Sequence, residues 1–580
     1  MNPKFFRNLR CAFGALAFVL PELASAQISC ATLPSVAPLA GNPAVFAATA
    51  TELTTAGRAY CMVNVTWRDP ALVGSAAGYA PGGPPTPDTF QNIRLGVALP
   101  LNTNTGAAAW GGRFVMTAGG SAQGSVPSLT PFIALDPPAM GGGSDSGHGD
   151  ANSGSGDTWG YITGVGLNMG KITDWAQGRA NYVTVRLGKQ LALTYYGTLP
   201  QRTYWRGFSG GGQMGWAAML NYPEEFDGAL IGSPSIFWEK HRLGDSWGAV
   251  VRRKVAQLTT PITAAQEAAA HAAALVACDA LDGVVDGFLS DPRKCTWSAT
   301  NNICGVAGAP AAPACLDPIQ AAGIDREFDG PRNSFGRRVW HPYERGVNRG
   351  VATVAGGGTA QVMRYAFADP TWAPTNLYAD QESINLAAAT GADVSKALTY
   401  AQAAQIYQIN GAQFIDLDHV EKIAKAHALG LKIIGYHGTA DNQVPLRGEI
   451  NFYSKAALYF GNGVSDDFSS LLHPWYRFFI MPGMTHTEQP QYLSLLIDWV
   501  ERGIPPERLT QPSVGSAGGG CPFPQQAKFL GGSISDPANY VCGGNVQTPA
   551  VICMLLTTPL GMETSNLLQS YGPKVFPAGC

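Results

Sequence analysis

A serine flanked by glycines stands in the pattern Gly-x-Ser-x-Gly, made by Gly207, Ser209 and Gly211. Residues 203–205 before it are β-branched or aromatic and predict a short buried strand, and residues 214–219 after it predict a helix. A serine at a sharp strand-to-helix turn projects its hydroxyl clear of the backbone, and glycines allow the close backbone approach that the turn needs. The pattern therefore predicts that Ser209 is a nucleophile. The alternative, a serine in a flexible glycine-rich loop, is disfavoured by the strand and helix on either side.

A serine hydroxyl becomes nucleophilic when a histidine takes its proton and a carboxylate orients that histidine. His486 follows a predicted strand over 475–481, and Asp441 follows a predicted strand over 431–437. Catalytic groups of open α/β sheets gather at the carboxyl ends of strands, and one chain order of such groups is Ser, acid, His. We therefore predict Asp441 as the acid and His486 as the base.

Other residues compete for these two roles. Asp416 and Asp418 are weaker candidates for the acid, because no predicted strand precedes them. His148 is a rival base, but it precedes the serine in the chain and lies in a Gly/Ser-rich run over 141–156. We interpret His148 as a structural or pocket-edge residue.

An oxyanion hole needs two backbone N–H donors, one from the residue after the nucleophile and one from an early loop. Gly210 is the residue after the serine. The early loop follows a predicted strand over 113–116, and its second donor is either Gly119 or Gly120. The residues leave that choice open.

Three aspartates and two glycines alternate over 279–288. Calcium takes six to eight oxygens from carboxylates and backbone carbonyls in a tightly bent loop. We predict a structural calcium site and no organic cofactor, and the glutamate that closes an EF-hand is missing. The alternative is a solvated acidic turn. The predicted ligands are the carboxylates of Asp279, Asp282 and Asp286 and the carbonyls of Val284 and Phe288.

The first 26 residues have the form of an export signal. Basic residues precede an apolar run over 12–20, and Ala24-Ser25-Ala26 offers a small-residue cleavage site. The apolar run is too short to span a bilayer, so we predict a secreted or periplasmic protein without a membrane partner. Only 14% of the residues are charged and the net charge is −3, with no basic cluster, so no nucleic-acid partner is expected.

Ten cysteines remain after the predicted cleavage, and an even number in an exported protein favours disulfides. No Cys-x-x-Cys pair is present, so zinc is not indicated. Spacing does not establish connectivity. Nearest-neighbour pairing would join Cys30 to Cys61, Cys278 to Cys295, Cys304 to Cys315, Cys521 to Cys542 and Cys553 to Cys580.

Together these motifs resemble the tannase and feruloyl esterase family, which includes a mono(hydroxyethyl) terephthalate hydrolase. The resemblance covers nearly the whole mature chain. It rests on the serine turn, the acidic loop and the segments 110–114, 145–148, 195–197, 222–228, 437–441 and 482–486.

The resemblance implies an α/β fold, namely an α/β-hydrolase domain over 27–234 and 431–580. It also implies a large lid domain over 235–430 that holds the calcium loop, and Ser209, Asp441 and His486 as the catalytic triad. A strand, turn, helix and strand around Ser209 agree with the right-handed crossover of a parallel sheet.

One departure from the family concerns two cysteines, which usually stand just before the serine and just after the histidine and form a disulfide. Here these positions hold Phe208 and Thr487, as expected if packing has replaced the bond. The residue after Gly212 is usually arginine and here is Gln213. These changes leave the chemistry intact and bear on the substrate pocket.

The leading functional hypothesis is a secreted serine carboxylic-ester hydrolase that cleaves esters of aromatic acids, feruloyl esterase- or tannase-like, through an acyl-enzyme. One alternative is a polyester or terephthalate-monoester hydrolase. Another is a non-catalytic, calcium-stabilised binding protein, against which three triad residues in the right order argue. Lid aromatic residues could stack on a substrate ring, namely Trp238, Trp340, Tyr343, Tyr365, Phe367 and Trp372.

Overall fold

The computed structural model describes residues 28–68, 92–149, 161–162, 166–167, 169–331, 340–348, 372–403, 417, 419–462, 467–511 and 514–545. The signal peptide predicted over 1–26 lies outside these residues. So do Asp416, Asp418, Tyr365, Phe367, Cys553 and Cys580.

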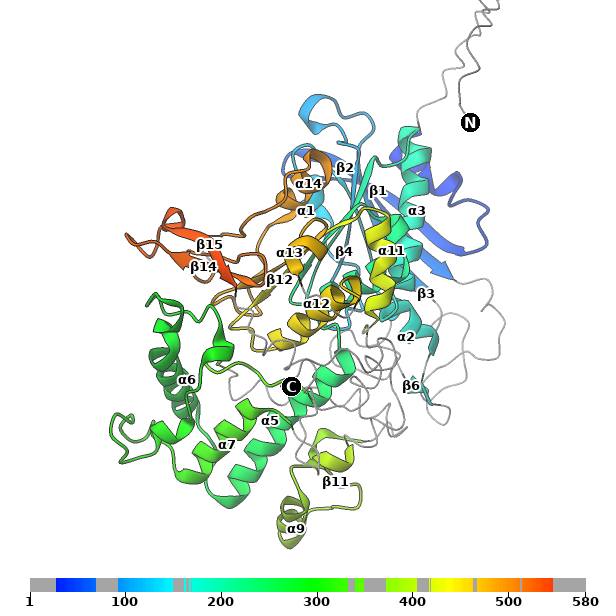
Figure 1. Ribbon diagram of the computed structural model, residues 1–580. Coiled ribbons are helices and arrows are strands. Elements are labelled where there is room, and N and C mark those ends of the chain that lie inside the picture. The colour runs from blue at the N-terminus through cyan, green and yellow to red at the C-terminus, as the bar shows by residue number, and fades with distance from the viewer. Residues whose placement is uncertain are drawn as a thin grey trace, which may run out of the picture.

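A nine-stranded sheet in the order β1-β2-β3-β5-β4-β8-β9-β12-β13 forms the centre of the molecule (Figure 1). The pairs from β1 to β5 are antiparallel, and every pair from β5 to β13 is parallel. The carboxyl ends of the parallel strands therefore meet at one edge, and the predicted α/β class is confirmed. The strands are β1 (Val45–Thr55), β2 (Arg58–Arg68), β3 (Asn92–Pro100), β4 (Arg113–Ala118), β5 (Met140–Ser144), β8 (Arg202–Phe208), β9 (Gly228–Gly232), β12 (Lys432–Gly438) and β13 (Tyr476–Met481).

Consecutive residues of the central strands enter two cores on opposite faces of the sheet. Phe114 and Met116 of β4 lie in the first core, and Val115 between them lies in the second. In β8, Trp205 lies in the first core and Tyr204 in the second. Parallel strands covered on both faces are apolar on both faces, which explains why these runs read as continuously hydrophobic. The first core includes residues of α3 (Arg179–Tyr196), α4 (Gly210–Asn221) and α12 (Leu446–Phe460), and the second includes residues of α1 (Thr130–Ile133) and α14 (Leu493–Arg502).

The chain between β9 and β12 is mainly helical where it is described. Figure 1 shows α5 (Trp238–Leu258), α6 (Ala264–Cys278), α7 (Pro318–Asp329) and α9 (Gln381–Ala389) together beyond one edge of the sheet. Arg252 of α5 hydrogen-bonds both Glu267 of α6 and Glu327 of α7, which ties three of these helices together. By contrast, α11 (Ile423–Ala428) packs against α4 of the sheet domain. The division at residues 234/235 and 430/431 remains a prediction.

The remaining α-helices and strands of the described chain are short. They are α2 (Met169–Trp175), α13 (Phe468–Leu471), the pair β6 (Tyr161–Ile162) and β7 (Gly166–Leu167), the pair β10 (Leu377–Tyr378) and β11 (Leu398–Thr399), and the hairpin of β14 (Gln525–Phe529) and β15 (Tyr540–Asn545).

No helix in the described ranges combines the length and the apolar character needed to cross a membrane.

Within the described residues there are four disulfides, and each joins two cysteines that follow one another in the sequence. The pairs are Cys30–Cys61, Cys278–Cys295, Cys304–Cys315 and Cys521–Cys542. The fifth nearest-neighbour pair, Cys553 with Cys580, falls outside the described residues. The Cys278–Cys295 bond closes the base of the predicted calcium loop.

Candidate active site

Ser209 occupies the turn between β8 and α4 with φ 57° and ψ −121°, a conformation that residues other than glycine seldom adopt. A Cβ on Gly207 would lie 2.1 Å from the carbonyl oxygen of Gly211, and a Cβ on Gly211 would lie 2.4 Å from that of Ala118. Both glycines of the motif are therefore required by close backbone approach. The predicted strand, turn and helix are all present.

Three side chains from separate loops meet at the carboxyl edge of the sheet. The Oγ of Ser209 lies 2.8 Å from Nε2 of His486, and Nδ1 of His486 lies 2.8 Å from Oδ2 of Asp441. These loops follow β8, β13 and β12, respectively. The structure therefore brings the predicted nucleophile, base and acid into one hydrogen-bonded chain.

Asp441 is buried and held from both sides. Its Oδ1 accepts the backbone N–H groups of Gln443 and Val444 at 2.9 and 2.8 Å. Burial raises the pKa of this carboxyl, but the imidazoles of His486 and His437 outweigh burial and hold the pKa of Asp441 well below its usual value. Asp441 thus remains ionised while it orients His486.

The loop that follows β4 lies against the first turn of α4. A Cβ on Gly210 would lie 1.8 Å from the carbonyl oxygen of Ser121. The N–H of Gly119 donates to Oε1 of Gln123 at 2.9 Å, whereas the N–H of Gly120 has no hydrogen-bond partner in the described part of the chain. Of the two glycines that the sequence left open, only Gly120 has an unengaged amide.

An aromatic ring occupies the side of the triad where the family disulfide is expected. The ring centroids of Phe208 and His486 are 5.1 Å apart, and Phe208 also lies 6.2 Å from the ring of Tyr436. Thr487 instead pairs its hydroxyl with that of Thr485 at 3.0 Å. Packing of Phe208 on the histidine thus takes the place of a covalent tie.

The sequence profile described as tannase and feruloyl esterase matches residues 92–543, which is most of the chain. The chain belongs to the tannase and feruloyl esterase family. Members of this family are carboxylic ester hydrolases, and so is this protein.

Individual relatives support this assignment. A probable feruloyl esterase of Arthroderma benhamiae is 26% identical over 470 residues, which cover 78% of this chain and 83% of that one. The mono(2-hydroxyethyl) terephthalate hydrolase of Piscinibacter sakaiensis is 26% identical over 505 residues, with coverage of 75% and 80%. The crystal structure of feruloyl esterase B from Aspergillus oryzae superposes with a TM-score of 0.66 at 20% identity, covering 86% of this chain and 96% of that one. The structural likeness confirms the α/β-hydrolase fold.

His148 contacts the loop that follows β4 and does not take the position beside Ser209. Its buried Nε2 donates to the carbonyl of Ala122 at 2.6 Å, and burial lowers the pKa of His148 to about 4. Ser209 is hydrogen-bonded to His486, as described above. The geometry therefore agrees with a structural role for His148.

The predicted calcium loop is a tight turn whose carboxylates accept N–H groups of the loop itself. Asp279 accepts from the amides of residues 286 and 287, and Asp282 from those of residues 284 and 290. Asp286 accepts from the amide of Phe288 and from the hydroxyl of Ser516. Burial, together with the nearby carboxylates of Asp282 and Asp279, raises the pKa of Asp286.

The fit of calcium to this loop is partial. The donor set consists of oxygen atoms only, as calcium prefers, and positive φ angles at Gly283 (92°) and Gly287 (85°) bend the chain as such a site requires. However, within the described ranges no three His, Cys, Asp or Glu side chains converge as ligands of one ion would. The calcium site and its five ligands therefore remain a prediction.

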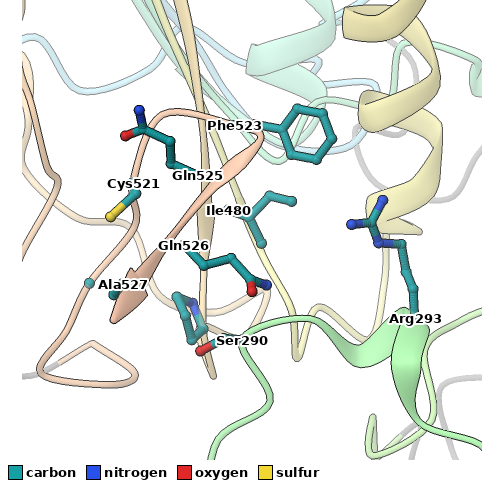
Figure 2. Close-up of a pocket in the computed structure, with 10 residues that line it drawn as sticks. Ser290, Arg293, Ile480, Cys521, Phe523, Gln525, Gln526 and Ala527 are labelled. Carbon is teal, nitrogen blue, oxygen red and sulfur yellow. The ribbon is translucent and has the colours of Figure 1, made fainter. Parts of the chain in front are cut away.

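The predicted calcium loop and the residues after it contact the segment that carries His486. A Cβ on Gly483 would lie 2.0 Å from the ring of Phe288, so that ring packs directly on the turn before His486. Figure 2 shows a pocket beside this turn, which is lined by Ser290 and Arg293, by Ile480 of β13, and by β14 with the segment that leads into it. The loop is thus placed to influence the position of His486.

The lid aromatic residues that the structure describes are core residues. Trp238 packs edge-to-face on Trp175 with ring centroids 5.0 Å apart, and Trp340 lies 5.1 Å from Phe237. Trp238, Trp340, Tyr343 and Trp372 are all buried. This burial does not support the predicted stacking of these four residues on a substrate ring.

Several polar residues near the site were not identified from the sequence as site residues. Gln123 accepts the N–H of Gly119 in the loop that follows β4, and Glu449 contacts His437, which lies next to Asp441. A weak signal existed, because a histidine ending a strand four residues before the acid is an unusual buried polar group. The buried amide of Gln213 has no hydrogen-bond partner among the described residues, and nothing in the structure explains it.

Proposed function

We propose that this protein is an exported serine esterase that cleaves esters of aromatic carboxylic acids through an acyl-enzyme. The observation that carries the proposal is the hydrogen-bonded chain from Ser209 through His486 to Asp441, with both distances at 2.8 Å. The aromatic acyl group is supported by the relatives, whose names include feruloyl esterase and terephthalate hydrolase.

In the proposed reaction, Oγ of Ser209 attacks the ester carbonyl carbon while Nε2 of His486 takes the hydroxyl proton. The electron pair of the carbonyl moves onto its oxygen, and the N–H groups of Gly210 and Gly120 bind that oxyanion. Collapse expels the alcohol, which takes the proton from His486 and leaves the acyl group on the serine. Water then attacks the acyl-enzyme by the same steps and releases the acid.

Export and calcium are further parts of the proposal. The form of residues 1–26 and the four disulfides support folding in an oxidising compartment. The carboxylates of Asp279, Asp282 and Asp286 with the carbonyls of Val284 and Phe288 would hold a structural calcium ion, which would stabilise the loop and take no part in the chemistry.

A second candidate is hydrolysis of terephthalate monoesters, favoured by the similarity to the Piscinibacter sakaiensis enzyme. It uses the same triad and differs in the acyl group. A non-catalytic binding protein is disfavoured, because the strained Ser209 backbone and the aligned His486 serve no purpose in binding alone.

The test is a comparison of kcat/KM for methyl ferulate, methyl gallate and mono(2-hydroxyethyl) terephthalate, with Ser209→Ala as the control. We expect hydrolysis of at least one aromatic ester by the wild type and none by the variant. A folded wild type inactive on all three esters would overturn the proposed substrate class, and a variant as active as the wild type would overturn the mechanism.

A further inference from the structure

A fully buried charged cluster lies behind the proposed catalytic acid. His437 is the second-last residue of β12, and Glu449 stands in the first turn of α12. Nδ1 of His437 lies 2.9 Å from Oε2 of Glu449, and its Nε2 lies 3.3 Å from Oδ2 of Asp441. None of the three side chains is exposed to solvent. Oδ2 of Asp441 therefore lies next to two imidazoles, that of His486 and that of His437.

Both ring nitrogens of His437 face hydrogen-bond acceptors. Nδ1 faces the Glu449 carboxylate, and Nε2 faces the backbone carbonyl of Val444 at 3.0 Å as well as Asp441. A neutral imidazole carries only one N–H and has an acceptor at its other nitrogen. A doubly protonated ring can donate from Nδ1 to Glu449 and from Nε2 to the oxygen atoms on its other side. A neutral ring beside an ionised Glu449 would instead place the lone pair of one ring nitrogen against an acceptor oxygen.

We propose that His437 is an imidazolium that forms a buried ion pair with Glu449 and acts as a positioning residue for Asp441. The proposal rests on the proposed function of the triad. In it, His437 contacts Oδ2, the same carboxylate oxygen that His486 contacts, while two backbone amides hold Oδ1. Both oxygens of Asp441 are then fixed, and His486 keeps one orientation.

The electrostatics of the cluster agree with this protonation state. Burial lowers the pKa of His437, but its hydrogen bonds to Asp441 and Glu449 outweigh burial and raise that pKa to about 10. Burial raises the pKa of Glu449 to about 7, against the lowering effect of His437. The pKa of His437 thus lies above that of Glu449, so the imidazole takes a proton before the carboxylate does.

The charge balance suggests why such a pair would be useful. Two carboxylates and one imidazolium carry a net charge of −1, which protonation of His486 during acyl transfer neutralises. The cation at His437 also makes Asp441 less basic, so the proton that His486 takes from the serine stays on the imidazole. The other titratable side chains that face the cluster are Tyr436 of β12 and Tyr476 of β13, and burial raises the pKa of both, so they stay neutral.

The first measurement is nitrogen-15 NMR of histidine-labelled enzyme at pH 8.5, well above the ordinary histidine pKa of about 6.5. We expect one histidine with both nitrogens protonated, and we expect its signal to be lost in His437→Gln. A wild-type spectrum without any doubly protonated histidine would reject the proposal without recourse to a variant. So would a doubly protonated signal that persists in His437→Gln.

The second measurement is the pH profile of kcat/KM. Removal of the cation in His437→Gln makes protonation of His486 easier, so the acidic limb should move to higher pH, with kcat lowered by about a hundredfold and KM within about twofold. His473→Gln is the matched control, because His473 is a buried histidine that donates to the carbonyl of Phe523 away from the triad. A profile in His437→Gln no different from that control would overturn the positioning role. Ser209→Ala distinguishes failure of the proposed function from failure of this inference. If the proposed function is wrong, Ser209→Ala retains activity, whatever the NMR spectrum of His437 shows.

Discussion

Asp441 accepts two backbone amides at Oδ1 and contacts Nδ1 of His486 through Oδ2, so the carboxylate selects the His486 tautomer that carries its proton on Nδ1. We predict that Asp441→Asn lowers kcat by up to ~10⁴-fold, because an amide presents an N–H where His486 needs an acceptor. The measurement is kcat on the best aromatic ester, with circular dichroism to verify the fold. A loss of less than tenfold in a folded variant would mean that another residue is the acid.

His148 makes stability depend on pH, since burial lowers its pKa to about 4 while the unfolded chain has a value of about 6.5. A lowered pKa stabilises the fold above the unfolded value, and this contribution is lost as pH falls from 6.5 through about 4. The loss amounts to about 3 kcal/mol. We predict that His148→Gln, which can still donate to Ala122, reduces the difference in free energy of unfolding between pH 7 and pH 4 by that amount. Urea unfolding at the two pH values measures the difference. An unchanged slope would show that His148 is not buried in its neutral form.

At the scale of elements, an ion pair joins the segment between β9 and β12 to helix α12. Arg447 of α12 makes two hydrogen bonds to Glu344, which is 3% exposed, at 2.6 and 2.8 Å. We predict that Arg447→Met destabilises the protein by about 3–5 kcal/mol, because it leaves a buried carboxylate without its partner. Urea unfolding measures the change, and Glu344→Gln in the same chain should restore part of it. Equal stability of the wild type and Arg447→Met would show that the two elements are not held together by this pair.

The elements around the triad could be predicted from the sequence because their signals are local. The strand, turn and helix at Ser209 and the strands before Asp441 and His486 each lie within about ten residues of the group that they position. The roles of Gln123 and Glu449 could not be predicted in this way. Gln123 also donates to the carbonyl of Ser144 in β5, and Glu449 contacts His437 in β12, and only the folded sheet determines where those partners lie. Pairing of the cysteines was left open for the same reason, although four pairs prove to be nearest neighbours.

Helix α11 illustrates another limit of the sequence. It precedes β12 within the range predicted as lid, yet it packs on α4, and Lys425 pairs with Glu224 after that helix. A short amphipathic helix does not reveal which of two neighbouring cores will bury its apolar face. Domain boundaries inside such a segment therefore need the folded structure.

At the scale of the whole molecule, the predicted calcium loop links the helical insertion to the catalytic edge through the contact of Phe288 with Gly483. We predict that chelation of the mature enzyme lowers both Tm and kcat, because an ion bound only by the folded state stabilises it and the loop supports the turn before His486. Asp282→Ala should lack this response to chelator. A melting curve and a kcat that are indifferent to prolonged chelation, with no calcium found by elemental analysis, would show that the acidic loop is a solvated turn.

The central claim is that Ser209 is the nucleophile that carries the acyl group, and covalent labelling tests it most directly. The enzyme would be treated with a p-nitrophenyl alkylphosphonate, and the adduct located by intact mass and peptide mapping. We predict one adduct per chain on the peptide that contains Ser209, formed at the rate at which ester hydrolysis is lost, and no adduct in Ser209→Ala. An adduct on another residue that accompanies the loss of activity, or equal labelling of Ser209→Ala, would contradict the account.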